Sequence, residues 1–300
     1  MSEADALSAP EVPPARTVAG CLPRPVHTFP RSSCYDPGSM VDLKPRSWKD
    51  ALRPFIPPPI LAVKKAMYYW VIDDQRTLPL DLFLLRPIAH MTFRQRRDFV
   101  RRMRETHRQV ECAHTHEEMV EVARSILTTR AAQDAVVVEA GCFKGGSSAK
   151  LSIAAMAVNR KLVVFDSFEG LPEVSSEDRG FYKGAYCGHL DEVVRNVSVF
   201  GNRRPCEFVK GWFEHTMPLF RRPVSVAYVD VDLVDSVKTC MSYLYPLLVP
   251  GGSIFSQDGH IPIVRQLLGD QSFWRKIGEP QPRLTGLGNK KLVRIQKPVR

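Results

Sequence analysis

The stretch that decides the fold is VVVEAGCFKGGSSAKL, residues 136–151. Its short apolar run predicts a buried parallel strand, and the glycines that follow predict a tight turn into a helix. Gly141 lets the backbone pass close to a ligand because it carries no Cβ. The free N–H groups at the start of the following helix then face that ligand. Strand, glycine turn and helix together predict a site for a nucleotide-type cofactor.

The spacing of these glycines distinguishes between cofactors. They read GxxxGG over residues 141–146, whereas the dinucleotide fingerprint reads GxGxxG. Cys142 and Phe143 stand where a nicotinamide dehydrogenase needs its second glycine for the pyrophosphate, so a dehydrogenase is disfavoured. S-Adenosylmethionine has no pyrophosphate and does not need that glycine. Glu139 can meet its cationic amino acid part, or it caps a neighbouring amide.

A second acidic residue follows the next apolar run, in VVFDSFEGLPE over residues 163–173. Asp166 at the end of that strand can accept both ribose hydroxyls, or it is a helix N-cap. The predicted cofactor-binding residues are Glu139, Gly141, Phe143, Gly145, Ser147, Asp166 and Ser167.

Predicted strands and helices alternate through the C-terminal part of the chain. Helices are predicted at residues 93–110, 116–129, 147–158, 191–200, 235–248 and 261–274. Strands are predicted at 134–139, 162–165, 207–210, 224–229 and 252–256, with a closing pair at 284–286 and 291–295. This alternation predicts an α/β fold: a mostly parallel, seven-stranded sheet with helices on both faces. We expect residues 116–298 to form this domain.

The N-terminal part differs in composition. Many of the 24 prolines crowd the first sixty residues, and residues 1–58 are predicted to be a disordered or loosely attached tail. Residues 59–115 are predicted to be a helical extension. Its segment from Ile60 to Met91 is interpreted as a lid, a dimerisation element or a helical cap, so a homo-oligomer is one of the alternatives left open.

The net charge of +10 favours acidic partners. Seven arginines lie in the predicted helix over residues 93–110, at positions 94, 96, 97, 101, 102, 104 and 108. They form either a solvated helix face or a surface for phosphate, RNA or an anionic substrate. No aromatic residues alternate with them for base stacking, which disfavours nucleic acid.

The cysteines and the apolar runs bear on the compartment. Seven scattered cysteines without a CxxC pair indicate reduced thiols in a cytoplasmic protein. No apolar run has the length needed to cross a bilayer, and the N-terminus lacks the pattern of a secretory signal. We therefore expect no membrane association.

Several blocks in one order resemble the macrocin O-methyltransferase family, class I enzymes that methylate sugar hydroxyls in antibiotic biosynthesis. The blocks are EAGCFKGGSS, FDSFEGLPE, HLDEVVRNVSVFGN, FVKGWFEHTMP, VAYVDVDLVDSVKTCMSYLYPLLVPGG and SQDGH. The resemblance runs from about Val138 to Trp274. It implies a Rossmann-like methyltransferase fold, S-adenosylmethionine as methyl donor and a small hydroxylated acceptor such as a sugar or natural-product intermediate.

The resemblance also implies a Mg²⁺ site held by Asp230, Gln257 and Asp258. Such hard oxygen ligands suit magnesium, which would lower the pKa of a bound substrate hydroxyl, with Asp230 as general base. Here Gln257 replaces an aspartate of the family pattern and Gly259 replaces a tyrosine. Asp232 is interpreted as a residue that braces the site. His260 is a second candidate catalytic base, a ligand, or a histidine in solvent.

Three hypotheses follow. The first is an O-methyltransferase acting on a small molecule. The second, motivated by Gln257 and Gly259, is a regulatory protein that binds S-adenosylmethionine without catalysis. The third is an RNA or protein methyltransferase whose acceptor binds the arginine-rich helix.

Overall fold

The computed structural model describes residues 80, 83–85, 88, 91–175, 178, 180–287 and 290–299. All of them belong to one unit of the chain, Trp48–Arg300. The predictions for the tail at residues 1–58, and for most of the extension before Met91, lie outside the described residues.

A seven-stranded sheet in the order β3-β2-β1-β4-β5-β7-β6 forms the centre of the fold. The first five strands pair in parallel, and β7 pairs antiparallel with both β5 and β6. This confirms the predicted α/β sheet. The strands are β1 (Val136–Ala140), β2 (Leu162–Asp166), β3 (Cys206–Lys210), β4 (Val224–Val229), β5 (Leu248–Ser256), β6 (Arg283–Thr285) and β7 (Val293–Gln296).

The strand order reverses between β1 and β4. From β1 the chain builds outward to β2 and β3 on one side, and then returns to place β4 and β5 on the other side. At such a switch point the loops that leave the carboxyl ends of neighbouring strands diverge and open a crevice. The fold therefore puts the loops after β1, β2, β4 and β5 at one edge of the sheet.

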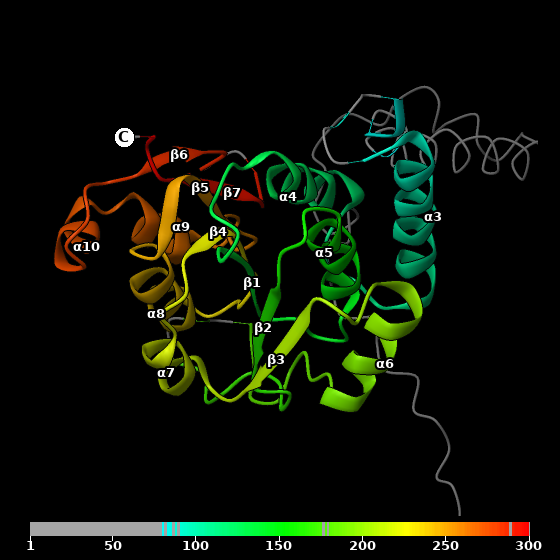
Figure 1. The fold of residues 1–300 in the computed structure, drawn as a ribbon. Helices are drawn as coiled ribbons and strands as arrows, with labels where there is room; N and C mark the ends of the chain where they lie inside the picture. The colour runs from blue at the N-terminus through cyan, green and yellow to red at the C-terminus, as the bar shows by residue number, and fades with distance from the viewer. Residues whose placement is uncertain are drawn as a thin grey trace, which may run out of the picture. The chain divides into compact units, whose positions relative to one another are not determined.

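Helices cover both faces of the sheet (Figure 1). One layer contains α3 (Phe93–Gln109), α4 (His116–Thr128), α5 (Gly146–Ala157) and α6 (Leu190–Phe200); the other contains α8 (Val234–Leu244), α9 (Pro262–Gly269) and α10 (Gln271–Lys276). Neighbouring residues of β1 pack into different layers, Val137 into the first and Val138 into the second. None of the helices in the described part of the chain combines the length and apolar composition needed to span a bilayer.

Two predicted helices differ from the structure by more than one residue, and the bounds of the other four differ by one. The helix predicted over residues 235–248 ends at Leu244, and Leu248 already begins β5. Pro246, which has no N–H to donate, follows the end of the helix. The helix predicted over 261–274 is two helices, because the chain turns at Asp270, whose carboxylate accepts the Ser272 N–H at 2.8 Å and caps α10. The short helix α7 (Phe213–Thr216) and the 3₁₀ turn η2 (Met217–Leu219) were not predicted.

The arginines of α3 have two different roles. Arg96 is buried, and its guanidinium donates to the carbonyls of Leu84 and Met91 at 3.0 and 2.8 Å. Arg102 donates to the Gly201 carbonyl at 2.7 Å and so ties α3 to the end of α6. These two arginines stabilise the fold, whereas the side chains of Arg94, Arg97, Arg101 and Arg108 are exposed.

Candidate functional site

The glycine turn after β1 passes directly against the loop after β4. Gly141 has φ +79°, a conformation that favours glycine. A Cβ at this position would lie 1.9 Å from the Asp230 carbonyl oxygen. The turn therefore requires glycine both for its backbone angle and for its close approach to the residue proposed as the base.

Asp166 joins the end of β2 to this turn. Its Oδ2 accepts the Cys142 N–H and its Oδ1 accepts the Phe168 N–H, each at 2.7 Å. Burial raises the pKa of Asp166, and the N–H donors oppose that shift. Each carboxylate oxygen can still accept a second donor. The structure thus brings together the glycine turn and the acidic residue that were predicted to bind the two parts of one adenosyl ligand.

Glu139 is fully buried at the end of β1. Ser148 Oγ donates to its Oε2 at 2.5 Å, while its Oε1 has no partner within the described residues. Burial raises the pKa of Glu139 to about 8. A buried carboxyl oxygen without a partner is costly, and a cationic ligand would satisfy it. Ser148 was missed by the sequence interpretation. The predicted residue, Ser147, is the neighbour of Ser148 at the start of α5 and opposes the rise in the pKa of Glu139.

Three other predicted cofactor residues have local structural roles as well. Ser167 Oγ donates to the Gly170 carbonyl at 2.9 Å and accepts the Glu169 N–H at 3.1 Å, which organises the turn after β2. Phe143 lies in the left-handed region with φ +47°, and its ring meets the edge of Tyr186 with centroids 5.9 Å apart. Gly145, with φ +80°, is the N-cap of α5.

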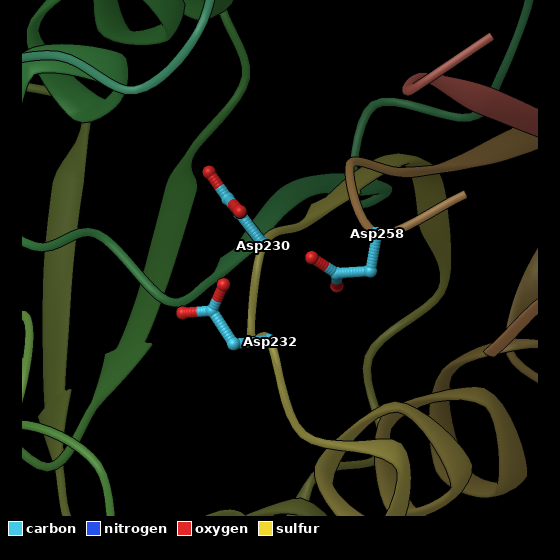
Figure 2. A group of neighbouring side chains, drawn as sticks. All are labelled: Asp230, Asp232 and Asp258. Carbon is cyan, nitrogen blue, oxygen red and sulfur yellow. The ribbon is translucent and has the colours of Figure 1, made fainter. Parts of the chain in front are cut away.

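Three carboxylates gather at the same edge of the sheet (Figure 2). Asp230 and Asp232 follow β4, and Asp258 follows β5. One oxygen from each lies within 4.8 Å of the others. The sequence interpretation paired Asp230 and Asp258 at this edge but gave Asp232 only a bracing role, whereas the structure places Asp232 inside the cluster.

A tight turn directs Asp232 into the cluster. The Leu233 N–H donates to the Val231 carbonyl at 2.6 Å across Asp232, whose φ is +60°. A bond between residues two apart around a positive φ is a γ-turn, a strained conformation for a residue with a side chain. Such strain is concentrated at functional sites, where the surrounding structure holds it in place.

Burial and mutual repulsion favour protonation of the three carboxyl groups. The pKa of Asp232 is raised to about 7, and that of Asp258 is raised well above its ordinary value, in both cases by burial first and then by the charge of Asp230. Burial also raises the pKa of Asp230. The positive charge of Lys291 opposes all three shifts, and its Nζ donates to the Ala113 carbonyl at 3.0 Å.

Two oxygens of the cluster accept hydrogen bonds, whereas other buried polar atoms of Gln257 and Asp258 have no hydrogen-bond partner among the described residues. Tyr228 OH donates to Asp230 Oδ2 at 3.1 Å, and the Val231 N–H donates to Asp258 Oδ2 at 3.3 Å. Asp258 Oδ1 and both amide atoms of the buried Gln257 have no partner within the part of the chain that the structure describes. Buried oxygens of this kind normally have a partner, and hard oxygen donors suit a hard divalent cation.

His260 lies at the rim of this cluster. Its side chain is exposed and hydrogen-bonds the backbone of Gln257. Its partial burial and the charge of Lys291 lower the pKa of the imidazole, which is therefore neutral at pH 7. The exposed histidine thus shares Lys291 with the carboxylates as a charged neighbour.

Comparisons with known proteins point to one family. The family model described as macrocin-O-methyltransferase (TylF) matches residues 91–288. The chain is 29% identical over 165 residues to the 8-demethyl-8-(2,3-dimethoxy-alpha-L-rhamnosyl)-tetracenomycin-C 4'-O-methyltransferase of Streptomyces olivaceus, which covers 51% of this chain and 63% of that protein. It is 30% identical over 146 residues to the mycinamicin III 3''-O-methyltransferase of Micromonospora griseorubida, which covers 43% of this chain and 57% of that protein. The chain thus spans less than two thirds of the length of each relative.

A solved structure supports the fold independently. The O-methyltransferase NovP superimposes with a TM-score of 0.52 and 20% sequence identity, covering 76% of this chain and 98% of that one. At this identity the likeness concerns the fold alone. The match to the family model extends over well more than half of the chain and contains the glycine turn, Asp166 and the carboxylate cluster. The chain therefore belongs to the macrocin O-methyltransferase family.

Proposed function

We propose that this protein transfers the methyl group of S-adenosylmethionine to a hydroxyl oxygen of a small molecule, a sugar or a natural-product intermediate. One observation carries the proposal: the glycine turn is bonded to Asp166 through Cys142 and packs against the loop that begins at Asp230. A methyl donor held by that turn would lie next to a candidate base. The printed names of the two relatives, both O-methyltransferases, support the choice of a hydroxyl acceptor.

Each end of the donor has a group in this chain that suits it. Glu139, with its unpartnered oxygen, would accept the ammonium of the amino acid part. Asp166 would accept the ribose hydroxyls with the lone pairs that its two backbone donors leave free. Gly141, Phe143, Gly145, Ser147 and Ser167 complete the proposed cofactor site as the backbone and walls of the turn.

The reaction would be a direct displacement. The acceptor oxygen forms a bond to the methyl carbon, the carbon–sulfur bond breaks, and its electron pair stays on sulfur. The hydroxyl proton passes to Asp230, whose raised pKa makes it a stronger base than an exposed aspartate. Tyr228 holds one carboxylate oxygen of Asp230 and leaves the other for this task. Alignment of the two substrates supplies much of the remaining rate enhancement.

Asp230, Asp258 and Gln257 are the proposed ligands of a Mg²⁺ ion, and Asp232 lies close enough to be a fourth. The unpartnered oxygens of Gln257 and Asp258 and the hard donor set fit such an ion. When bound, Mg²⁺ supplies positive charge that lowers the pKa of a coordinated hydroxyl. His260, neutral and at the rim, is the alternative base.

A specific observation keeps a regulatory protein as the second candidate. Gly259 stands where the family has tyrosine, and a Cβ there would lie 2.3 Å from Val293 Cγ2 and 2.7 Å from the Lys291 carbonyl oxygen. The packing of β7 therefore excludes the family residue at this position. Such a protein would bind the cofactor without turning it over.

The structure gives less support to an acceptor site on the arginine-rich helix. Arg96 and Arg102 hold the fold together, so a test of an RNA or protein acceptor has to use the exposed arginines of α3, Arg94, Arg97, Arg101 and Arg108. We also propose that residues 116–298 are the methyltransferase domain. The last helix of the 59–115 extension, α3, contributes Phe99, Val100 and Met103 to its core.

Titration calorimetry with S-adenosylmethionine, followed by methyl transfer to glycosylated natural products, tests the proposal. We expect saturable binding by the wild type, and release of S-adenosylhomocysteine only when a hydroxylated acceptor is added. Binding without turnover on any acceptor panel, in the presence of Mg²⁺, favours the regulatory protein. Absence of binding removes both candidates.

A further inference from the structure

A second group of reactive side chains lies outside the proposed site, between α5 and the loop that joins α3 to α4. Lys150 comes from α5 and is only 1% exposed. Its Nζ lies 2.7 Å from His114 Nε2 and 3.6 Å from Cys112 Sγ. The proposed methyl transfer uses none of these three residues.

Lys150 is unusual because its partners are a histidine and a thiol. The ion pairs formed by the described residues do not include Lys150, although a buried lysine is normally paired with a carboxylate. Burial lowers the pKa of Lys150. The neutral amine is the nucleophilic form of lysine, and desolvation is the usual way in which proteins favour it.

Cys112 is the partner that small oxidants can reach. Its side chain is partly exposed, whereas Cys142, Cys206 and Cys240 are buried. The Cys112 sulfur packs closely against the start of α5. A Cβ added to Gly146, the first residue of that helix, would lie only 2.4 Å from the sulfur. Burial raises the pKa of the Cys112 thiol, while the neighbouring Lys150 opposes that shift. A neutral amine beside a partly exposed thiol can accept the thiol proton, and the resulting thiolate is the form that a peroxide oxidises.

We propose that Cys112 and Lys150 are a modification site, at which a peroxide produces a covalent bond between Sγ and Nζ. In the first step the thiol proton passes to Nζ, the thiolate sulfur attacks the peroxide, and the O–O bond breaks. The hydroxide that leaves takes this proton from Nζ, so that the products are a sulfenic acid and water. In the second step the Nζ lone pair attacks Sγ, the S–O bond breaks, and the oxygen leaves as water after taking one proton from the amine. The product is a sulfenamide, in which sulfur is oxidised by two electrons and the peroxide is reduced; condensation of a sulfenic acid with a nitrogen is established cysteine chemistry.

The geometry suits the second step. The separation of 3.6 Å between Sγ and Nζ is close to the distance of about 3–3.5 Å at which groups react without further rearrangement. His114 Nε2, at 2.7 Å from Nζ, can pass the proton that the amine loses to the departing oxygen. Because the amine is held next to Sγ by the fold, it competes effectively with water for the sulfenic acid.

The cross-link would fasten the loop before α4 to the helix that starts at the glycine turn. It would close a loop from residue 112 to residue 150, and covalent loops of this length stabilise proteins chiefly by restricting the unfolded chain. The expected consequence is a higher Tm after oxidation that reverts on reduction. This inference stands on the cluster alone and does not depend on the proposed function.

Mass spectrometry of the full chain tests the inference. The protein is treated with hydrogen peroxide, free thiols are alkylated, and the protein is digested with trypsin. Residues 109–124 carry Cys112, and residues 145–160 contain Lys150 as an internal cleavage site. We expect these two segments to appear as one linked species, uncleaved at Lys150 and lighter by about 2 Da than the sum of the two peptides. Reductant should restore the separate peptides.

Matched variants assign the bond. Lys150→Met and Cys112→Ser should abolish the linked species, and Cys187→Ser, which removes another partly exposed thiol, should leave it unchanged. Fragmentation is needed because Met119 lies in the Cys112 peptide and can also be oxidised. The wild-type digest decides the matter even if a variant fails to fold. Oxygen added to Cys112 with normal cleavage at Lys150, or a Cys112 that stays fully alkylated, would overturn the inference.

Discussion

The backbone N–H of Cys142 donates to Oδ2 of Asp166 at 2.7 Å, and this bond joins the turn after β1 to the end of β2. Cys142 follows β1 and Asp166 ends β2, the parallel strand beside it, so the two residues come from separate βα units. Their contact fixes the distance between the part of the site proposed to hold the amino acid end of the donor and the part proposed to hold its ribose. Asp166 therefore has a structural and a binding role at once.

Replacement of Asp166 by alanine should weaken both roles. The N–H groups of Cys142 and Phe168 would lose their acceptor, which costs about 1–3 kcal/mol of folding free energy for each group that water does not reach. Loss of the charged contacts to ribose should reduce the affinity for S-adenosylhomocysteine on the order of 10- to 100-fold. Calorimetry and thermal unfolding measure the two effects. Asp191→Ala, an exposed acidic residue in the first turn of α6, is the control, and an equal loss of affinity there would contradict the assignment.

A pair of glycine variants separates backbone strain from steric contact. Gly141 and Gly278 have nearly the same φ, +79° and +77°. A Cβ added to Gly141 would lie 1.9 Å from the Asp230 carbonyl oxygen, whereas a Cβ added to Gly278 would meet no atom within 4 Å. Gly278→Ala should cost about 1–2 kcal/mol, the penalty of the left-handed conformation alone. Gly141→Ala should cost several times more or abolish ligand binding, because the turn and the β4 loop must separate. Equal denaturation midpoints for the two variants would show that the close approach is absent.

Much of the fold could be predicted from local pattern, and most errors occur where tertiary contacts decide. The apolar runs of β1, β2 and β4 are buried on both faces and cannot be confused with exposed segments. Leu248, the first residue of β5, was assigned to a helix because Leu247 and Leu248 continue the apolar pattern of the preceding helix, and only pairing with Val224 shows that Leu248 is in a strand. The position of Asp232 within the carboxylate cluster depends on the γ-turn after β4, which strand alternation does not predict.

The cofactor residues could be placed from their position in the sequence, whereas the contact between Cys112 and Lys150 could not. Gly141 and Asp166 follow strands directly, so sequence position was enough to place them at one edge of the sheet. Cys112 and Lys150 are separated by a helix and a strand, and no periodic pattern connects them. Their contact depends on how α4 and the loop before it pack on α5, which the sequence alone does not state.

Binding of the donor should release a proton at neutral pH. The pKa of Glu139 is about 8 because the group is buried, so this carboxyl group is protonated at pH 7 in the free protein. An ammonium group beside it favours the ionised form and lowers its pKa. We expect calorimetry of S-adenosylhomocysteine at pH 7, in buffers of different ionisation enthalpy, to show release of on the order of one proton, and affinity that increases as the pH rises toward 8. Glu139→Gln should abolish the release; proton release that persists in this variant would assign it to another group.

The raised pKa values also predict how stability depends on pH. Asp232 and Glu139, with pKa values of about 7 and 8, hold protons in the folded state that the unfolded chain has already released. Stability from these groups is therefore lost as the pH rises through 7 and 8. The buried His116 makes stability rise with pH, because burial lowers its pKa to about 3. This contribution changes only below the ordinary pKa of 6.5, so it does not affect the range from pH 7 to pH 8.5. Between pH 7 and pH 8.5 the Tm should fall, and a Tm that rises over this interval would contradict the account.

Mg²⁺ should reverse that loss. A divalent ion binds the ionised carboxylates preferentially and stabilises the folded state by mass action, so its effect on the Tm should be larger at pH 8.5 than at pH 7. Asp258→Asn should remove most of this effect. Asp235→Asn, an exposed residue in the first turn of α8, should retain it. Equal stabilisation by Mg²⁺ in both variants would place the ion elsewhere.

A crystal structure of the protein with S-adenosylhomocysteine tests the central claim most directly. The account predicts ligand density between the glycine turn and Asp166, with the ribose hydroxyls on the Asp166 carboxylate, the ammonium at Glu139 and the sulfur directed toward Asp230. Density at another place, or a ribose that does not contact Asp166, would contradict it and leave only the fold and the family established.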